Sequence, residues 1–353
     1  MVRQHNWLET IFMNHVFNSK MIDVNKNCFN LIRLIAAIQV LFGHAVIHFN
    51  LDMGGGLHAI WLSFRGVPVF FILSGFLLWN SLTKKKQSFK EYFRNRVLRL
   101  YPELILCVIL NSIVITIFMW DQLKLLPFTL FQFTQTTIFQ FWTPNFLRAY
   151  GVGTPNGSLW TIGVMVQCYI ILYLIFSIYR KNKKRLFFIF LIGVLFNLGV
   201  PLLEHRIPNI IYKLICQTFI PYYWLFILGA LIREYFNQII PKLIKYNNFI
   251  ILVLLLISFL NFEVGYGVYE TIKSIILAFA FIGFAYKYPK LNIKKDFSYG
   301  IYLYHMIIIN ILIEISFSCD YYTILFVIMS SLCLSYISNK FIKGIVLKST
   351  DRK

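Results

Sequence analysis

Three residues that can carry a proton interrupt a long apolar segment near the start of the chain. Residues 29–49, FNLIRLIAAIQVLFGHAVIHF, contain Arg33, His44 and His48 among hydrophobic side chains. Such groups are costly to desolvate in lipid, so they are expected to face a protein interior or a wet cavity, where they can bind a ligand or move a proton. The alternative is that Arg33 reaches the near membrane surface along its aliphatic stem and the histidines sit at the far one.

The spacing of Arg33 and His44 puts them on one face of a helix. They are 11 residues apart, which is about 1100° of helical rotation, roughly 20° from three full turns, and about 16 Å along the axis. The whole segment is about 31 Å long as a helix, the thickness of a bilayer's hydrocarbon core. The pattern predicts a membrane helix with a cation near one surface and an imidazole, on the same face, toward the other.

The composition is typical of a multi-pass membrane protein. Of the 353 residues, 58% are hydrophobic and 14% are charged, so an all-α polytopic fold is expected. Apolar runs predict ten membrane spans, near residues 29–49, 60–80, 103–120, 157–178, 186–203, 216–232, 247–262, 268–286, 297–316 and 322–339.

Lysine and arginine predict the orientation of these spans. An even number of spans leaves both termini on one side, and loops on that side hold basic clusters such as residues 84–86 and 233–245. Cytoplasmic loops carry the excess of positive charge, so both termini are predicted to be cytoplasmic and the loop at 121–156 external. The net charge of +20 is spread loop by loop, which favours membrane lipids as partners and no nucleic acid.

Three regions follow from these assignments: a cytoplasmic segment at 1–26, a membrane domain at 27–340 and a basic cytoplasmic tail at 341–353. Apolar residues recur in the first region at a spacing compatible with an amphipathic surface helix: Trp7, Leu8, Ile11, Phe12, His15 and Val16. No signal peptide is expected there, and Met21 is an alternative start. The six cysteines occur singly, without a CxxC pair, so neither a disulfide framework nor a metal site is expected.

A row of arginines precedes the third span, in FKEYFRNRVLRLYPELI. Arg96 and Arg99 are three residues apart and share a helix face, with Arg94 nearby. Guanidinium groups bind phosphates through forked hydrogen bonds, so this row is suited to a phosphorylated ligand. The alternative interpretation is the ordinary basic flank of a membrane helix.

Further candidates for substrate contact lie in or beside the other spans: Arg65, Ser158, Trp160, Tyr169 and His305. His305 shares the ninth span with Glu314, and two polar groups of this kind exceed what lipid packing needs. The long external loop at 121–156 is rich in aromatic residues, so it is expected to fold back on the membrane and roof a site.

Taken together, five segments resemble the integral-membrane acyltransferase family 3, the family of bacterial polysaccharide O-acetyltransferases. They are RLIAAIQVLFGH, GVPVFFILSGFLL, FRNRVLRLYP, SLWTIGVMVQCYIILYL and FSYGIYLYHM, and the resemblance covers about residues 27–340. It implies a ten-helix domain in the bacterial inner membrane that passes an acyl group, usually acetyl, from cytoplasmic acyl-CoA to a sugar hydroxyl on the outer side. The acceptor is then a surface polysaccharide or its lipid-linked precursor.

The resemblance also implies roles for individual residues. His44 matches the family's essential histidine and Arg33 the basic residue before it, so both are predicted to be catalytic. Arg96 and Arg99 match the family's arginine-rich segment and, with Arg94, are predicted to bind the phosphates of acetyl-CoA. His44 would act either as a general base toward the acceptor hydroxyl or as a transient acyl carrier.

The chain departs from the family pattern in its fourth span. Met165 stands where the family usually has a glutamate, whereas Gln167 and Tyr169 are retained. Either the acid is dispensable here, or another carboxylate such as Glu314 substitutes for it, or the chain is an impaired member. The C-terminal SGNH domain that often accompanies the family is not expected, so the chain corresponds to the stand-alone type.

Two other classes of function remain open. A transporter or flippase for polysaccharide or lipid-linked sugar would use Arg33, His44 and His305 to line a passage. A non-catalytic assembly subunit of an export complex would fit the loss of the acid at Met165. Turnover of acetyl-CoA that depends on an added glycan separates the enzyme from both.

Overall fold

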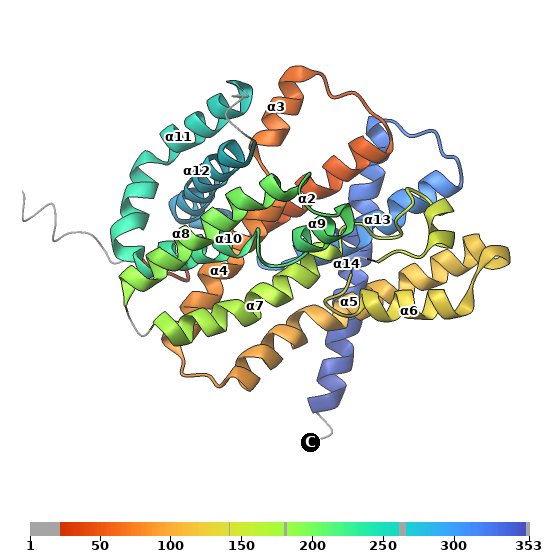
Figure 1. Cartoon of the computed structure of the whole chain (residues 1–353), viewed down its shortest axis with the longest axis horizontal. Helices are drawn as coiled ribbons and strands as arrows, with labels where there is room; N and C mark the ends of the chain where they lie inside the picture. Colours follow the sequence, from red (N-terminus) through yellow and green to blue (C-terminus); the bar gives the residue numbers. More distant parts are fainter. Residues whose placement is uncertain (1–21, 141, 180–181, 261–265, 351–353) are drawn as a thin grey trace, which may run out of the picture.

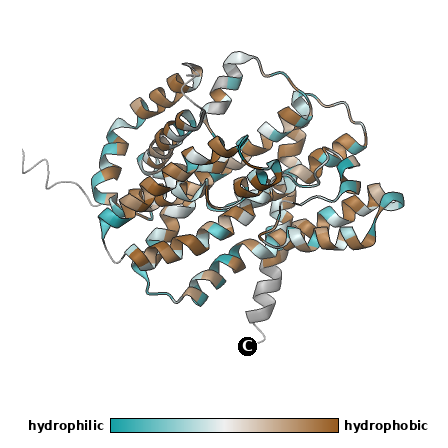
Figure 2. Ribbon diagram, viewed as in Figure 1, coloured by the Kyte–Doolittle hydropathy of each residue, from teal (hydrophilic) through white to brown (hydrophobic). Residues whose placement is uncertain are grey.

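The structure is a computed structural model that describes residues 22–140, 142–179, 182–260 and 266–350. Every regular element within these residues is a helix, and the helices pack side by side into one bundle (Figure 1). They are mostly hydrophobic along their lengths, with hydrophilic residues gathered toward the loops (Figure 2). The predicted amphipathic segment at residues 7–16 lies outside the described residues.

Each of the ten predicted spans overlaps a helix, and eight of them overlap a helix that is long enough to cross a membrane. Eight helices are long and apolar enough to cross a membrane: α2 (Phe29–His48), α4 (Gly66–Lys84), α5 (Phe89–Met119) with η1 (Trp120–Gln122), α7 (Trp160–Tyr179), α8 (Lys183–Gly199) with η3 (Val200–Leu203), α11 (Phe236–Leu260), α12 (Tyr266–Lys287) and α14 (Tyr321–Thr350). Two further helices lie where spans were predicted but are shorter: α10 (Tyr223–Glu234) and α13 (Ser298–Glu314). The remaining helices lie between spans: α3 (Gly55–Ser63), α6 (Leu125–Gln135), η2 (Asn145–Ala149), α9 (Asn209–Cys216) and η4 (Pro289–Leu291). The prediction of an all-α polytopic membrane protein is confirmed.

The sixth predicted span differs most from its helix. Only Cys216 of this span belongs to α9; a turn that contains Pro221 follows, and the rest of the span forms most of α10. Every residue from Tyr223 to Ile232 is buried, so α10 lies inside the bundle. It packs backbone to backbone on α4, because a Cβ atom at Gly75 would lie 2.1 Å from the Phe226 carbonyl oxygen and one at Gly229 2.1 Å from that of Ile72.

The arginine row and the third span form one continuous helix. Ser88 caps α5 reciprocally with Glu91: each side chain accepts a hydrogen bond from the other residue's backbone N–H. The helix then continues through Pro102 to Met119. The arginines are therefore held on the same rigid element as the membrane-spanning part of α5.

The loop at 121–156, which is predicted to be external, is fastened to α13. The buried Asn310 accepts a hydrogen bond from Val152 N–H (2.9 Å) and donates one to the Pro155 carbonyl (2.8 Å). Glu314 accepts another from the N–H of Gly151. Gly151 has φ +53°, and a Cβ there would overlap the Asn310 side chain, so this contact requires glycine.

The orientation remains a prediction that labelling can test. Lys86 and Lys124 are both exposed and lie at opposite ends of α5. In a background without the native cysteines, Lys86→Cys and Lys124→Cys should react with a membrane-impermeant maleimide from opposite sides, the second from outside. Labelling of both from the same side would contradict the assignment of this span.

Candidate active site

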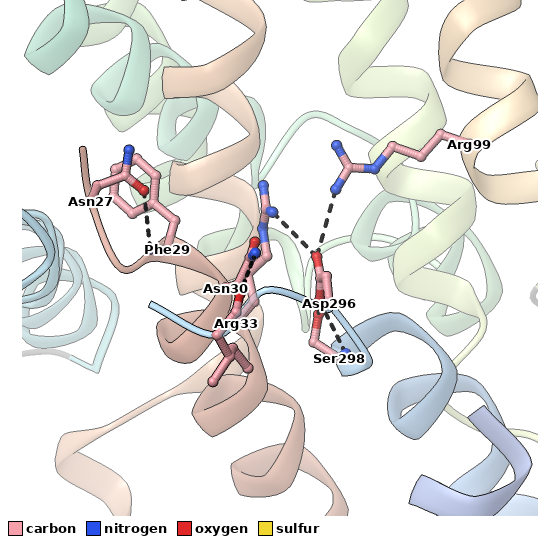
Figure 3. A network of polar contacts seen from close by, with 8 residues as sticks. Asn27, Phe29, Asn30, Arg33, Arg99, Asp296 and Ser298 are labelled. Atoms are coloured by element: carbon pink, nitrogen blue, oxygen red, sulfur yellow. Dashed lines mark hydrogen bonds and ion pairs between the residues drawn. The ribbon is translucent and has the colours of Figure 1, made fainter. Parts of the chain in front are cut away.

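Three charged side chains meet at the predicted cytoplasmic end of the bundle (Figure 3). Arg33 of α2 donates a hydrogen bond to Asp296 over 3.3 Å, and Arg99 of α5 lies 3.8 Å from the same carboxylate oxygen. The other oxygen of Asp296 accepts hydrogen bonds from the backbone N–H (3.1 Å) and hydroxyl (2.5 Å) of Ser298, the first residue of α13. One carboxylate thus joins three helices, and the pairing compensates the largely buried charge of Arg33.

A cavity of about 240 Å³ opens beside this cluster. Its walls include Arg33, Arg96, Arg99 and Asp296 at one end. The Nε atom of Arg96 is buried without a hydrogen-bond partner among the described residues, and no carboxylate there pairs with this guanidinium. The cavity therefore presents positive charge that is suited to an anionic ligand.

The other wall residues carry the cavity inward along α5, α7 and α13. Glu103 and Tyr169 line it, as do Thr161 and Tyr302. The ring of Tyr302 lies 6.0 Å from that of His305. The cavity thus extends from the arginines to within one side chain of the histidines.

Two histidines of the first and ninth spans form a direct pair. Nδ1 of His44 lies 2.8 Å from Nε2 of His305, and the rings stack with centroids 5.1 Å apart. His305 is fully buried, whereas His44 is partly exposed. His48 is the next ring along α2, 6.0 Å from His44 by centroids.

The hydrogen bonds assign the protons of this pair. Nδ1 of His305 lies 3.1 Å from the Ile301 carbonyl oxygen, which can only accept, so this nitrogen carries a hydrogen. In the neutral ring Nε2 of His305 is then an acceptor, and Nδ1 of His44 donates to it. The lone pair of His44 is left on Nε2, which has no partner among the described residues. This is the arrangement of an imidazole that is ready to accept a proton or attack a carbonyl carbon.

Arg33 and His44 share α2 but are not brought together. Arg33 is paired with Asp296 at one end of the helix, and His44 is paired with His305 three turns further on. Arg94 is exposed and does not line the cavity that Arg96 and Arg99 line.

The remaining predicted contacts are distributed over the bundle. Tyr169 lines the arginine cavity, and Trp160 lines a second one on the predicted outer side. Ser158 is buried and bonds Asn156 and the Tyr302 carbonyl, so it fastens the loop to α13. Arg65 forms an ion pair of 2.6 Å with Glu270 and lines neither cavity.

Two carboxylates of the site were not predicted from the sequence. Asp296 is the one acid in the basic loop at 287–297, and its isolation among lysines was the available signal. Glu103 is buried, accepts a hydrogen bond from Ser338 (2.7 Å) and lines the same cavity as Met165. Glu314, by contrast, is bound to Gly151 of the external loop. No group of three or more His, Cys, Asp or Glu in the described residues is placed to hold a metal ion.

This is a multi-pass membrane protein with a cationic cavity and a histidine pair formed between α2 and α13, and comparison with known proteins gives its family. The family model described as "Acyltransferase domain" matches residues 26–340. The chain therefore belongs to the acyltransferase family 3, as its motifs had indicated, and it acts on an acyl donor. No solved structure matches the chain.

Two relatives are similar over most of the chain, and a third over less than half of it. Nodulation protein 10 of Rhizobium leguminosarum bv. viciae is 27% identical over 82% of this chain and 85% of its own length. The O-acetyl transferase of Shigella phage Sf6 is 27% identical over 88% and 93%, respectively. The peptidoglycan O-acetyltransferase OatA of Listeria monocytogenes is 29% identical over 44% of this chain and 25% of its own length. Together with the family match, they confirm the prediction of an O-acetyltransferase enzyme.

The shared carboxylate gives a prediction for stability. Asp296→Asn leaves the largely buried Arg33 without a counter-ion and should lower the stability of the purified protein by about 1–3 kcal/mol. Arg99→Gln removes the longer contact of an arginine whose side chain is 53% exposed, so it should cost less than about 1 kcal/mol. Thermal unfolding midpoints in one detergent compare the two, and equal shifts would contradict the geometry.

Proposed function

We propose that the protein transfers an acetyl group from cytoplasmic acetyl-CoA to a hydroxyl of a cell-surface polysaccharide or its lipid-linked precursor, across a bacterial inner membrane. The observation that carries the proposal is the arrangement on α2: an arginine cavity at one end and a histidine with a free Nε2 further along. The names of the phage and Listeria relatives support acetyl as the group transferred.

The donor binds at the arginine end. Arg96 has no carboxylate partner among the described residues, and its guanidinium faces the cavity beside Arg99. The diphosphate bridge and the 3′-phosphate of acetyl-CoA are anionic and match a guanidinium fork. Arg33, held by Asp296, acts as a fixed positive wall of this site and not as a proton-transfer group.

The acceptor reacts at the histidine end. As a general base, Nε2 of His44 takes the proton of the sugar hydroxyl while that oxygen attacks the thioester carbonyl; the C–S bond breaks and the proton passes to the departing thiolate. As an acyl carrier, the same nitrogen attacks the carbonyl first, the C–S bond breaks and CoA leaves as its thiolate. The hydroxyl oxygen then takes the acetyl group from the imidazole, and the hydroxyl proton neutralises the thiolate. Both routes need the lone pair on Nε2, and both give an acetyl ester and CoA.

His305 is a positioning residue in this scheme. It accepts the Nδ1 hydrogen of His44 and is itself fixed by the Ile301 carbonyl. These bonds select one tautomer of His44 and hold its ring, as the acid of a catalytic triad does for its histidine. The interpretation of His305 as a substrate contact is less well supported by this geometry.

The donor site gives the next prediction. Arg96→Gln and Arg99→Gln each remove a charge-assisted hydrogen bond worth about 1.5–3 kcal/mol, so KM for acetyl-CoA should rise roughly 10- to 150-fold. Arg94→Gln is the matched control, because Arg94 is exposed on the same helix and lies off the cavity. If all three variants have the same KM for acetyl-CoA, the arginine row is the ordinary basic flank of a membrane helix and not a donor site.

The histidine pair tests the proposed chemistry. His44→Ala should lower acetyl transfer by about 10²–10⁴-fold, the usual loss for a general acid–base group, and at least as much for a carrier. His305→Ala should also lower kcat, and His305→Gln should restore part of it because the amide oxygen can accept from Nδ1 of His44. Neither change should affect KM for acetyl-CoA. The measurement is glycan-dependent release of CoA by purified protein.

His48→Ala is the control for this experiment. His48 lies one turn beyond His44 and has no hydrogen-bond partner in the described part of the chain, so its removal should leave activity near that of the wild type. Full activity of a correctly folded His44→Ala protein would sink the catalytic assignment and favour a transporter.

A further inference from the structure

The second cavity lies at the opposite end of the bundle and has no role in the chemistry above. It measures about 550 Å³, within the range of roughly 300–1,000 Å³ that is usual for ligand sites. Its walls come from α6, the loop that follows it, the start of α7, and α9. On the predicted topology all of these elements lie on the outer side of the membrane.

The walls combine amides with indoles. Among the described residues no carboxylate lines the cavity. Four amide side chains and two tryptophans do: Gln135, Gln140, Asn156, Gln217, Trp142 and Trp160. Arg148 and Lys213 add positive charge. The amides of this surface can donate and accept hydrogen bonds, and the indoles present flat apolar faces. With two cationic side chains the surface does not repel an anion.

Two of the amides are already engaged by the protein. Gln140 accepts a hydrogen bond from Gly163 N–H (2.9 Å) and donates one to the Gln135 carbonyl (2.7 Å). Asn156 donates to the Leu303 carbonyl (2.9 Å) and accepts from the Ser158 hydroxyl (2.7 Å). Gln140 thus fastens the wall to α7, and Asn156 fastens it to α13 two residues from His305.

Gln135 differs from these two amides. The residue is only 3% exposed, yet its side-chain amide makes no hydrogen bond to any described residue, and it lines the cavity. Its amide atoms are not among the enclosed ones, so they can bond a ligand in the cavity. The Oε1 of Gln217 is enclosed and has no partner in the described part of the chain. Leaving such an atom unpaired costs about 1–3 kcal/mol, so it is expected to be satisfied by what occupies the cavity.

We infer that this cavity binds a sugar ring of the acceptor glycan. A pyranose carries hydroxyls around its edge and presents C–H groups on its faces, which match the amides and the indoles, respectively. An acyl tail would leave the Gln135 amide unpaired. The inference rests on the proposed function, since it names where the acceptor of that reaction is held.

The test uses two variants of one residue type on one helix. Gln135→Leu removes the free amide from the cavity wall, whereas Gln132→Leu, on the same helix, removes an amide that does not line the cavity and has no partner in the described residues. Trp142→Ala is a second cavity variant, and its partly exposed side chain makes it unlike a core substitution. The probe is the organism's surface polysaccharide, stripped of esters by mild alkali and cleaved to oligosaccharides, with labelled acetyl-CoA.

Gln135→Leu should raise KM for the oligosaccharide roughly 3- to 10-fold, as loss of one or two hydrogen bonds implies, with KM for acetyl-CoA unchanged. Trp142→Ala should act in the same direction, and Gln132→Leu should behave as the wild type. If the wild type transfers acetyl and both cavity variants match Gln132→Leu, the acceptor site is elsewhere and the enzyme assignment stands. If the wild type transfers no acetyl to this glycan, the proposed function fails, and the inference fails with it.

Discussion

The hydrogen bond between His44 and His305 fixes α2 against α13 in the interior of the bundle. Lipid offers no hydrogen-bond partners, so an imidazole in a membrane helix has to find them within the protein. Here His44 donates a hydrogen bond to His305, and His305 donates one to the Ile301 carbonyl. The ion pair of Arg33 with Asp296 joins the same two segments at a second point. Two contacts along one pair of helices set the separation between the arginine end and the histidine end.

Besides its contacts with α2, the helix α13 also anchors a loop. Beyond the histidine it carries Asn310 and Glu314, which bind the backbone of the loop that is predicted to be external. Its own carbonyls at Tyr302 and Leu303 accept hydrogen bonds from Ser158 and Asn156. This helix is buried from end to end apart from a few positions, which fits a short span surrounded by protein. The helix α13 therefore lines the first cavity and anchors the loop that lines the second, although the two cavities lie toward opposite ends of the bundle.

Hydropathy predicted the spans because burial in lipid requires an apolar run of fixed length, and helical periodicity predicted that Arg33 and His44 share a face. Such rules describe single helices. They contain no information about which helix lies next to which, so the partners Asp296 and His305, about 260 residues away along the chain, were not predictable. The length of α10 was missed for the same reason, because glycine contacts with α4 allow it to be enclosed by other helices.

The carboxylates around Met165 illustrate how tertiary structure changes the interpretation of a substitution. From the sequence alone, Glu314 was a candidate to replace the glutamate that the family usually carries at this position. Glu314 is engaged by Gly151 N–H in the external loop and does not line the cavity that Met165 lines. Glu103 does line it, from α5 instead of α7, and shares its walls with Arg33, Arg96 and Arg99. Glu103 thus supplies a carboxylate to the cavity from another helix, although Met165 supplies none. The methionine by itself is therefore weak evidence for an inactive chain.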